Sequence, residues 1–193
     1  MSHVADRYRK LSRHFLDLVA RVPDDAWGAP SPCEGWSARD VVAHVVDVHG
    51  MMLRPLSREL GPAPRVADDP LGALRAAVDD VQRVLDDPTL AGTEYDGYFG
   101  PTRVEDTIDR FLGMDLVVHA WDLARAVGID ERIPADEVAR VQADADALGD
   151  TMRAPNVVGP AIEAPSGSTG QDRLLAFLGR DPDWTAGTTK ART

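Results

Sequence analysis

The sequence predicts an all-α protein, a bundle of helices in a single domain. Apolar residues make up 44% of the 193 residues but aromatic residues only 6%, so the core must consist mainly of Leu, Val and Ala. Ala and Leu are good helix formers. Apolar residues recur at steps of three and four in several segments, whereas few segments alternate polar and apolar residues. The length fits one domain with a real core. We assign residues 1–184 to it and expect residues 185–193 to form a flexible tail.

The first two expected helices are His3–Val22 and a segment from Ser37 to about Leu53. The first has a continuous apolar face and should end before Pro23, since the residue before a proline avoids helical geometry. Ser37 is placed to cap the second helix, and Asp40 at the third helical position approximates a capping box.

Two further long helices are expected at Pro70–Leu85 and at about Arg103–Val127, the latter ended by Gly128. Between them, residues 88–103 are rich in Gly, Thr, Tyr and Pro and predict a loop. The aromatic residues of this loop, between Tyr95 and Phe99, could line a ligand pocket or simply cover the end of the bundle.

The C-terminal part predicts shorter elements. A helix is expected at about Ala135–Met152, followed by an irregular stretch rich in Pro and Gly at Asn156–Gly170. A short helix is expected at Gln171–Leu178.

Charge and cysteine content exclude several functions. The formal net charge of −11 disfavours binding to nucleic acid or to anionic membrane surfaces. No segment approaches the roughly 20 apolar residues that a membrane span requires. Cys33 is the single cysteine, so a disulfide within the chain is excluded. The charged segment Asp6–Lys10 leaves no apolar core of signal-peptide length near the N-terminus. We therefore expect a cytoplasmic protein.

The fourth long helix carries polar residues where its apolar stripe should continue. Steps of three and four place on one side Val104, Ile108, Phe111, Asp115, His119 and Asp122. Charged groups are rarely buried unless they are paired or bind a metal. The second helix shows the same pattern once, because His44 lies three residues after Val41 and four before Val48.

These polar residues suit a divalent metal site. Asp115 and His119 are one helical turn apart, and His44 from a facing helix would supply a third ligand. Three protein ligands plus water are usual in catalytic zinc sites. The mixed set also suits nickel, iron or manganese.

The pattern leaves other interpretations open. His44 could be a core histidine bonded to a carbonyl, and Asp115 could be paired with Arg110 or Arg125. Asp122 could orient an imidazole or be a surface carboxylate. His49 fits the His44 face poorly and is not included among the ligands. Cys33 could be a reactive thiol or a half-buried loop residue.

Three segments carry a resemblance to a known family: Ser31–Val45 (SPCEGWSARDVVAHV), Asp115–Ala124 (DLVVHAWDLA) and Gln171–Trp184 (QDRLLAFLGRDPDW). The first two resemble the second and fourth helices of the DinB-like superfamily. More narrowly, they resemble the N-terminal metal-binding domain of mycothiol-dependent maleylpyruvate isomerase. The third resembles the ending of an uncharacterised actinobacterial subgroup.

The resemblance implies a DinB-like four-helix bundle, here with short extra C-terminal helices, and a divalent metal at one end of its core. The ligands would be His44, Asp115 and His119, with zinc favoured over nickel, iron and manganese. Two features differ from the isomerase, which typically has Glu at the position of Asp115 and carries a separate C-terminal domain.

The expected function is that of a divalent-metal-binding protein. The resemblance implies a thiol-dependent transferase or isomerase-like enzyme, with mycothiol as cosubstrate and a small electrophile as substrate. It assigns no catalytic residue beyond the ligands. A non-catalytic metal or small-molecule binding protein of stress response is the alternative, and a structural bundle with internally paired His and Asp is a third interpretation. A homodimer through the bundle faces is compatible with all three.

Overall fold

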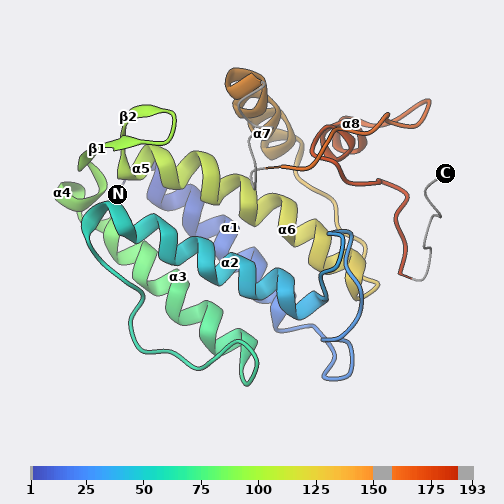
Figure 1. Cartoon of the computed structure of the whole chain (residues 1–193), viewed down its shortest axis with the longest axis horizontal. Coiled ribbons are helices and arrows are strands. Elements are labelled where there is room, and N and C mark those ends of the chain that lie inside the picture. Colours follow the sequence, from blue (N-terminus) through green and yellow to red (C-terminus); the bar gives the residue numbers. More distant parts are fainter. Residues whose placement is uncertain (1, 150–157, 187–193) are drawn as a thin grey trace.

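Four long helices lie side by side in the computed structural model, which describes residues 2–149 and 158–186 (Figure 1). They are α1 (His3–Val19), α2 (Ala38–Leu53), α3 (Pro70–Asp86) and α6 (Gly113–Ala126). Helices α1 and α2 each pack against both α3 and α6, so the four helices form a bundle around a common core. The predicted all-α bundle is confirmed.

Local sequence signals account for most of the helix ends. The Ser37 hydroxyl accepts a hydrogen bond from the Asp40 amide, and the Asp40 carboxylate accepts one from the Ser37 amide, so the predicted capping box is present. A short 3₁₀ turn, Arg54–Leu56, follows α2. Helix α1 ends at Val19 and not at Val22, because the chain leaves the helix through hydrogen-bonded turns before Pro23.

The segment expected to be a loop contains regular structure. It holds a short helix, α4 (Pro88–Ala91), and two antiparallel strands, β1 (Glu94–Gly97) and β2 (Gly100–Arg103). Tyr98 and Phe99 form the two-residue connection of this hairpin. The expectation of a loop was wrong here, because each strand has only four residues and shows too little alternation to be recognised.

The fourth expected helix is interrupted. It consists of α5 (Val104–Thr107), a π-helical segment at Ile108–Leu112, and α6. The Arg7 side chain of α1 reaches this segment and donates a hydrogen bond to the Asp109 carbonyl oxygen (2.6 Å). A Cβ at Gly113 would lie 2.5 Å from Nη1 of Arg7, so glycine permits this close approach.

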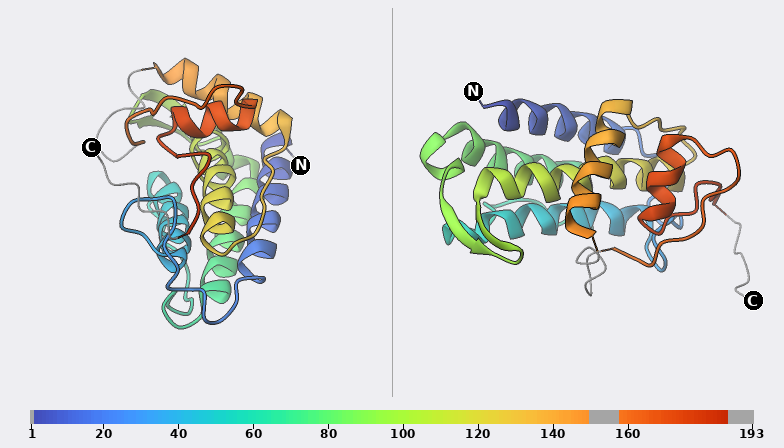
Figure 2. Two further views of the ribbon diagram at one scale, coloured as in Figure 1. Left: turned by 90° about the vertical axis from the view of Figure 1, so that its right-hand side faces the viewer. Right: turned by 90° about the horizontal axis from the view of Figure 1, so that it is seen from above.

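Helices α7 (Ala135–Leu148) and α8 (Gly170–Phe177) lie across one side of the bundle, at a steep angle to its helices (Figure 2). Thr169 caps α8 in a second capping box. The helix therefore begins at Gly170, one residue before the expected start at Gln171. The expected end of α7 at Met152, the start of the irregular stretch at Asn156 and residues 187–193 of the expected tail lie outside the described residues. None of the described helices is long and apolar enough to cross a bilayer.

Candidate metal centre

The structure brings His44, Asp115 and His119 together. His44 comes from the middle of α2, and the other two come from consecutive turns of the adjacent α6. The distance from His44 Nε2 to Asp115 Oδ2 is 3.5 Å, and that from His119 Nε2 to Asp115 Oδ1 is 3.9 Å. One candidate ligand atom from each residue lies within 4.8 Å of the other two. The three predicted residues therefore converge on one point.

These side chains lie at the boundary between the core and a cavity. His119 is 5% exposed, whereas the side chains of Asp115 and His44 are 21% and 33% exposed. A metal site with an open coordination position must be mostly buried and yet reachable from solvent, and these three side chains meet both conditions. His119 is buried among apolar residues of α6, at the position where the sequence interrupts the apolar stripe of that helix.

Asp122 orients the imidazole of His119. Its Oδ2 lies 2.9 Å from His119 Nδ1, and the Asp122 side chain is fully buried. A carboxylate partner favours the tautomer in which Nδ1–H donates and Nε2 keeps its lone pair. That lone pair is the one on the side of Asp115 and His44. The interpretation of Asp122 as a surface carboxylate is therefore wrong.

Two further residues contact Asp122, and neither is linked to it by any spacing in the sequence. Arg180 donates a hydrogen bond from Nη2 to Asp122 Oδ2 (3.1 Å), and the Cys33 thiol donates one to the same oxygen (3.3 Å). Arg180 follows α8 through Gly179, whose φ is +82° and where a Cβ would lie 2.9 Å from the Pro160 carbonyl oxygen. This tight turn directs Arg180 into the site. No pattern in the sequence indicates it.

The carboxyl groups of Asp115 and Asp122 are both held in the ionised form. Burial opposes ionisation of Asp122, but Arg180 and His119 outweigh it and lower the pKa of that carboxyl. For Asp115, burial likewise opposes ionisation, and His44 and His119 lower the pKa. At neutral pH the site therefore presents a negatively charged oxygen ligand at Asp115.

Cys33 remains a neutral thiol. Burial, together with the charge of Asp122, raises its pKa to about 12. Cys33, His119 and Asp122 also have ligand atoms close enough for a metal. The Arg180 guanidinium lies 3.6 Å from Cys33 Sγ and next to Asp122 Oδ2, and its positive charge disfavours a cation there. The cluster of His44, Asp115 and His119 is the better site.

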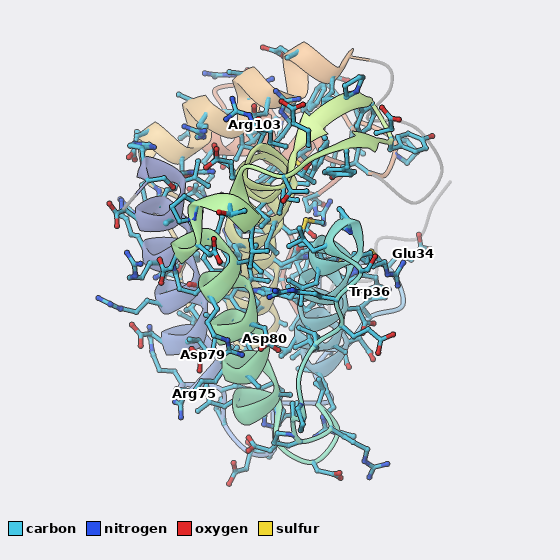
Figure 3. All side chains as sticks on the ribbon, turned by 90° about the vertical axis from the view of Figure 1, so that its left-hand side faces the viewer. Glu34, Trp36, Arg75, Asp79, Asp80 and Arg103 are labelled. Carbon is cyan, nitrogen blue, oxygen red and sulfur yellow. The ribbon has the colours of Figure 1, made fainter. Side chains whose placement is uncertain are left out.

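Trp36 covers one side of both imidazoles. Its ring centroid is 4.9 Å from that of His44 and 6.0 Å from that of His119, and the two imidazoles meet edge to face. Trp36 immediately precedes the Ser37 cap, so the start of α2 fixes its position beside the helix (Figure 3). The packing restricts rotation of the rings and excludes water from that side.

A core histidine bonded to a carbonyl is present, but it is His49. Its ring is fully buried and Nδ1 lies 2.6 Å from the Val45 carbonyl oxygen. Burial lowers its pKa to about 4, so the ring is neutral. His49, and not His44, is therefore the core histidine that is bonded to a carbonyl group.

The candidate ligands line a cavity of about 1500 Å³. Its walls come from α2, the hairpin, the π-helical segment, α6, α7 and the segments on both sides of α8. Tyr95, Tyr98 and Phe99 line it, so the structure supports the interpretation of the aromatic loop as part of a pocket. Figure 3 shows Arg103 at the hairpin end of the molecule and Trp36 beside α2.

A smaller cavity of about 550 Å³ lies between α1, another face of α6 and the residues before α7. Two of its carboxylates are already paired, Glu131 with His14 and Glu137 with Arg7. It therefore offers a weaker candidate for a metal or reactive site.

Comparison with known proteins identifies the family of the chain. Residues 8–124 match the family model for the mycothiol maleylpyruvate isomerase N-terminal domain, a range that contains all three candidate ligands. The chain is also 30% identical over 173 residues to uncharacterized proteins of Mycobacterium tuberculosis strains CDC 1551 and H37Rv, covering 86% of this chain and 91% of theirs. No solved structure gives a significant match. The chain thus belongs to the family of the mycothiol maleylpyruvate isomerase N-terminal domain.

Proposed function

We propose that the protein binds one divalent metal ion through His44, Asp115 and His119, and uses it with a low-molecular-weight thiol to convert a small electrophile. The convergence of two imidazole nitrogens and one carboxylate oxygen at the wall of a large cavity carries this proposal. The description of the family favours mycothiol as this thiol.

The donor set fits a zinc-sized ion. Two ligand atoms about 2.1 Å from a tetrahedral zinc ion are separated by about 3.4 Å. The distance of 3.5 Å from His44 Nε2 to Asp115 Oδ2 is close to this value, and one atom from each of the three residues lies within 4.8 Å of the other two. Zinc is therefore the first candidate, and nickel, iron and manganese remain alternatives for the same ligands.

A divalent ion held here would act as a Lewis acid that lowers the pKa of a thiol or water in the remaining coordination position. The chain's own residues prepare that position. Asp122 holds His119 in the tautomer that presents Nε2, and Trp36 shields the two rings. Small-molecule pockets commonly measure roughly 300–1000 Å³. The cavity of about 1500 Å³ has room for a thiol and a second substrate together.

Metal content tests the site. Mass spectrometry should detect near-stoichiometric metal in the wild-type protein and its loss in His44→Ala and His119→Ala. His14→Ala is the matched control, because His14 lies on α1 and pairs with Glu131 away from the site. A wild-type protein that binds no metal after incubation with zinc, nickel and manganese would overturn the proposal.

A second assay tests the chemistry. Metal-loaded protein should accelerate the consumption of mycothiol by at least one member of a panel of electrophiles, and His119→Ala should not. Bound metal without thiol binding or consumption would overturn the enzymatic half of the proposal. That outcome would favour the alternative, a metal or small-molecule binding protein without catalysis.

A further inference from the structure

The large apolar side chains that are exposed gather at one place. Among the described residues they are Met51, Tyr98, Phe99 and Ile162, and all four line the cavity that contains the candidate ligands. They come from α2, the hairpin and the segment before α8, which are distant in sequence. Single exposed apolar residues need no explanation, but a group of them around one concave site marks a surface that binds apolar groups.

The aromatic members form an ordered row. The ring of Phe99 stacks on that of Phe111 with centroids 5.4 Å apart and an interplanar angle of 16°. The ring of Tyr98 meets that of Phe99 edge to face with centroids 4.9 Å apart, and Tyr98 is 80% exposed. The row joins the hairpin to the π-helical segment and leaves one ring available for a further aromatic partner.

The charged groups that line the described part of the cavity offer no unpaired guanidinium group to an anion. Every arginine among the described lining residues is paired with a carboxylate: Arg110 with Asp144 (3.4 Å), Arg140 with Asp109, and Arg180 with Asp122 (3.1 Å). The described lining also includes five carboxylates, from Glu34, Asp106, Asp109, Asp115 and Asp144. With a divalent ion bound, the three guanidinium groups and the ion together only balance the five carboxylates, so a small dicarboxylate would gain no net attraction and would find no guanidinium group in the described lining that is not already paired.

We propose that the electrophile taken by this cavity is an uncharged molecule with an aromatic or large apolar body, and not a small dicarboxylate. The inference rests on the proposed function of the same site. The apolar rim and the aromatic row would hold the body of the molecule, with its reactive carbon toward the ligands. For an α,β-unsaturated ketone, the thiol sulfur bonds to the β-carbon and the α-carbon takes the proton, so nothing is oxidised and no group leaves.

Calorimetric titration of the metal-loaded protein tests the substrate class without thiol present. The probes are 4-phenylbut-3-en-2-one, an uncharged aromatic enone, and fumarate, a dicarboxylate with the same kind of double bond. We expect the enone to bind at least about tenfold more tightly. Tighter binding of fumarate, or equal binding of the two, would overturn the inference.

Two variants test separately the aromatic contact at Tyr98 and the pairing of Arg110 with Asp144. Tyr98→Ser should weaken enone binding about threefold to tenfold, as expected for one aromatic contact, and Tyr98→Phe should restore it. Asp144→Asn frees Arg110 and should strengthen fumarate binding while leaving the enone affinity unchanged. Unchanged enone affinity in Tyr98→Ser, or unchanged fumarate affinity in Asp144→Asn, would count against the inference.

Metal content measured on the same samples distinguishes a failure of the proposed function from a failure of the proposed substrate class. Absence of metal would overturn the proposed function. Bound metal together with a preference for fumarate would overturn only the substrate class.

Discussion

Asp122 illustrates how one buried side chain links several groups at the residue scale. It accepts hydrogen bonds from His119, Arg180 and Cys33 while fully buried. The carboxylate therefore fixes a candidate ligand on one side and the C-terminal segment on the other. Its second oxygen has no hydrogen-bond partner among the described residues, so all three contacts depend on Oδ2.

Asp122→Asn should weaken metal binding about 10- to 100-fold, because the neutral amide no longer stabilises the required tautomer of His119. Competition with a chromophoric zinc chelator measures the change in dissociation constant. Asp130→Asn is the control, since the side chain of Asp130 is 77% exposed and lies in the segment that follows α6. A dissociation constant equal to that of the wild type would show that Asp122 does not act through His119.

His49 should make the protein less stable in acid. Its pKa in the folded protein is about 4, below the ordinary value of 6.5, so the unfolded chain binds more protons in that interval. The free energy of unfolding should therefore fall as the pH drops from 6.5 to 4, by on the order of 3 kcal/mol from this residue.

Urea unfolding over this pH range measures the effect, and His49→Phe should flatten the slope. His14→Gln is the comparison. Glu131 raises the pKa of His14, so its contribution is present at low pH and is lost as pH rises. Because that side chain is 49% exposed, the contribution should be small. An unchanged slope in His49→Phe would mean that other groups cause the acid sensitivity.

The sequence predicted the three candidate ligands, because their positions follow from the periodicity of single helices. The i, i+4 spacing of Asp115 and His119, and the position of His44 within an apolar stripe, are properties of single helices. Arg180 was not predictable, because its contact with Asp122 spans 58 positions and depends on how the segment after α8 packs. The spacing of five residues separated His49 from the His44 face, but it did not indicate that His49 is the buried core histidine.

At the scale of elements, one buried arginine joins the π-helical segment to two helices. Arg7 of α1 pairs with Asp109 of this segment (2.8 Å) and with Glu137 of α7 (2.6 Å), and its side chain is 7% exposed. One side chain thus joins three elements, and two further ion pairs, Arg140 with Asp109 and Arg110 with Asp144, also join the π-helical segment to α7.

Arg7→Met should lower the free energy of unfolding by about 3–5 kcal/mol, because it leaves Glu137 buried without a countercharge. Arg9→Met is the matched control two residues along the same helix. Arg9 forms more exposed pairs with Asp6 and Asp86, and its loss should cost less than about 1 kcal/mol. Equal effects in urea unfolding would contradict a special role for Arg7.

The elements that the sequence predicted are those with local signals. The capping box at Ser37 and Asp40 involves residues three apart, and it was visible directly. The hairpin was not, because its strands are stabilised by pairing with each other and not by an extended alternating pattern. The π-helical segment was hidden for a related reason, since its polar partner, Arg7, is more than a hundred residues away.

At the scale of the whole molecule, the C-terminal part completes a site that belongs to the bundle. The match to the family model ends at residue 124, yet Arg180 supplies the countercharge for Asp122 inside the matched region. The segments around α8 also line the cavity. The extra helices are therefore structurally coupled to the candidate metal centre.

Arg180→Met should destabilise the metal-free protein by about 3–5 kcal/mol, because Asp122 would be buried without its guanidinium partner. Bound metal would partly replace that positive charge, so zinc should raise the melting temperature of this variant more than that of the wild type. Arg173→Met, an exposed position on α8, is the control. Equal zinc-induced shifts in Arg180→Met and the wild type would argue against coupling between the two regions.

The packing of Trp36 against the two imidazoles gives the protein its own optical probe. Of the four tryptophans, Trp36 is the one among the lining residues of the cavity. Its indole lies within 6.0 Å of both His44 and His119, so a paramagnetic ion such as Ni²⁺ should quench its emission, whereas Zn²⁺ should mainly shift it. Occupancy of the centre could then be followed in real time in unlabelled protein.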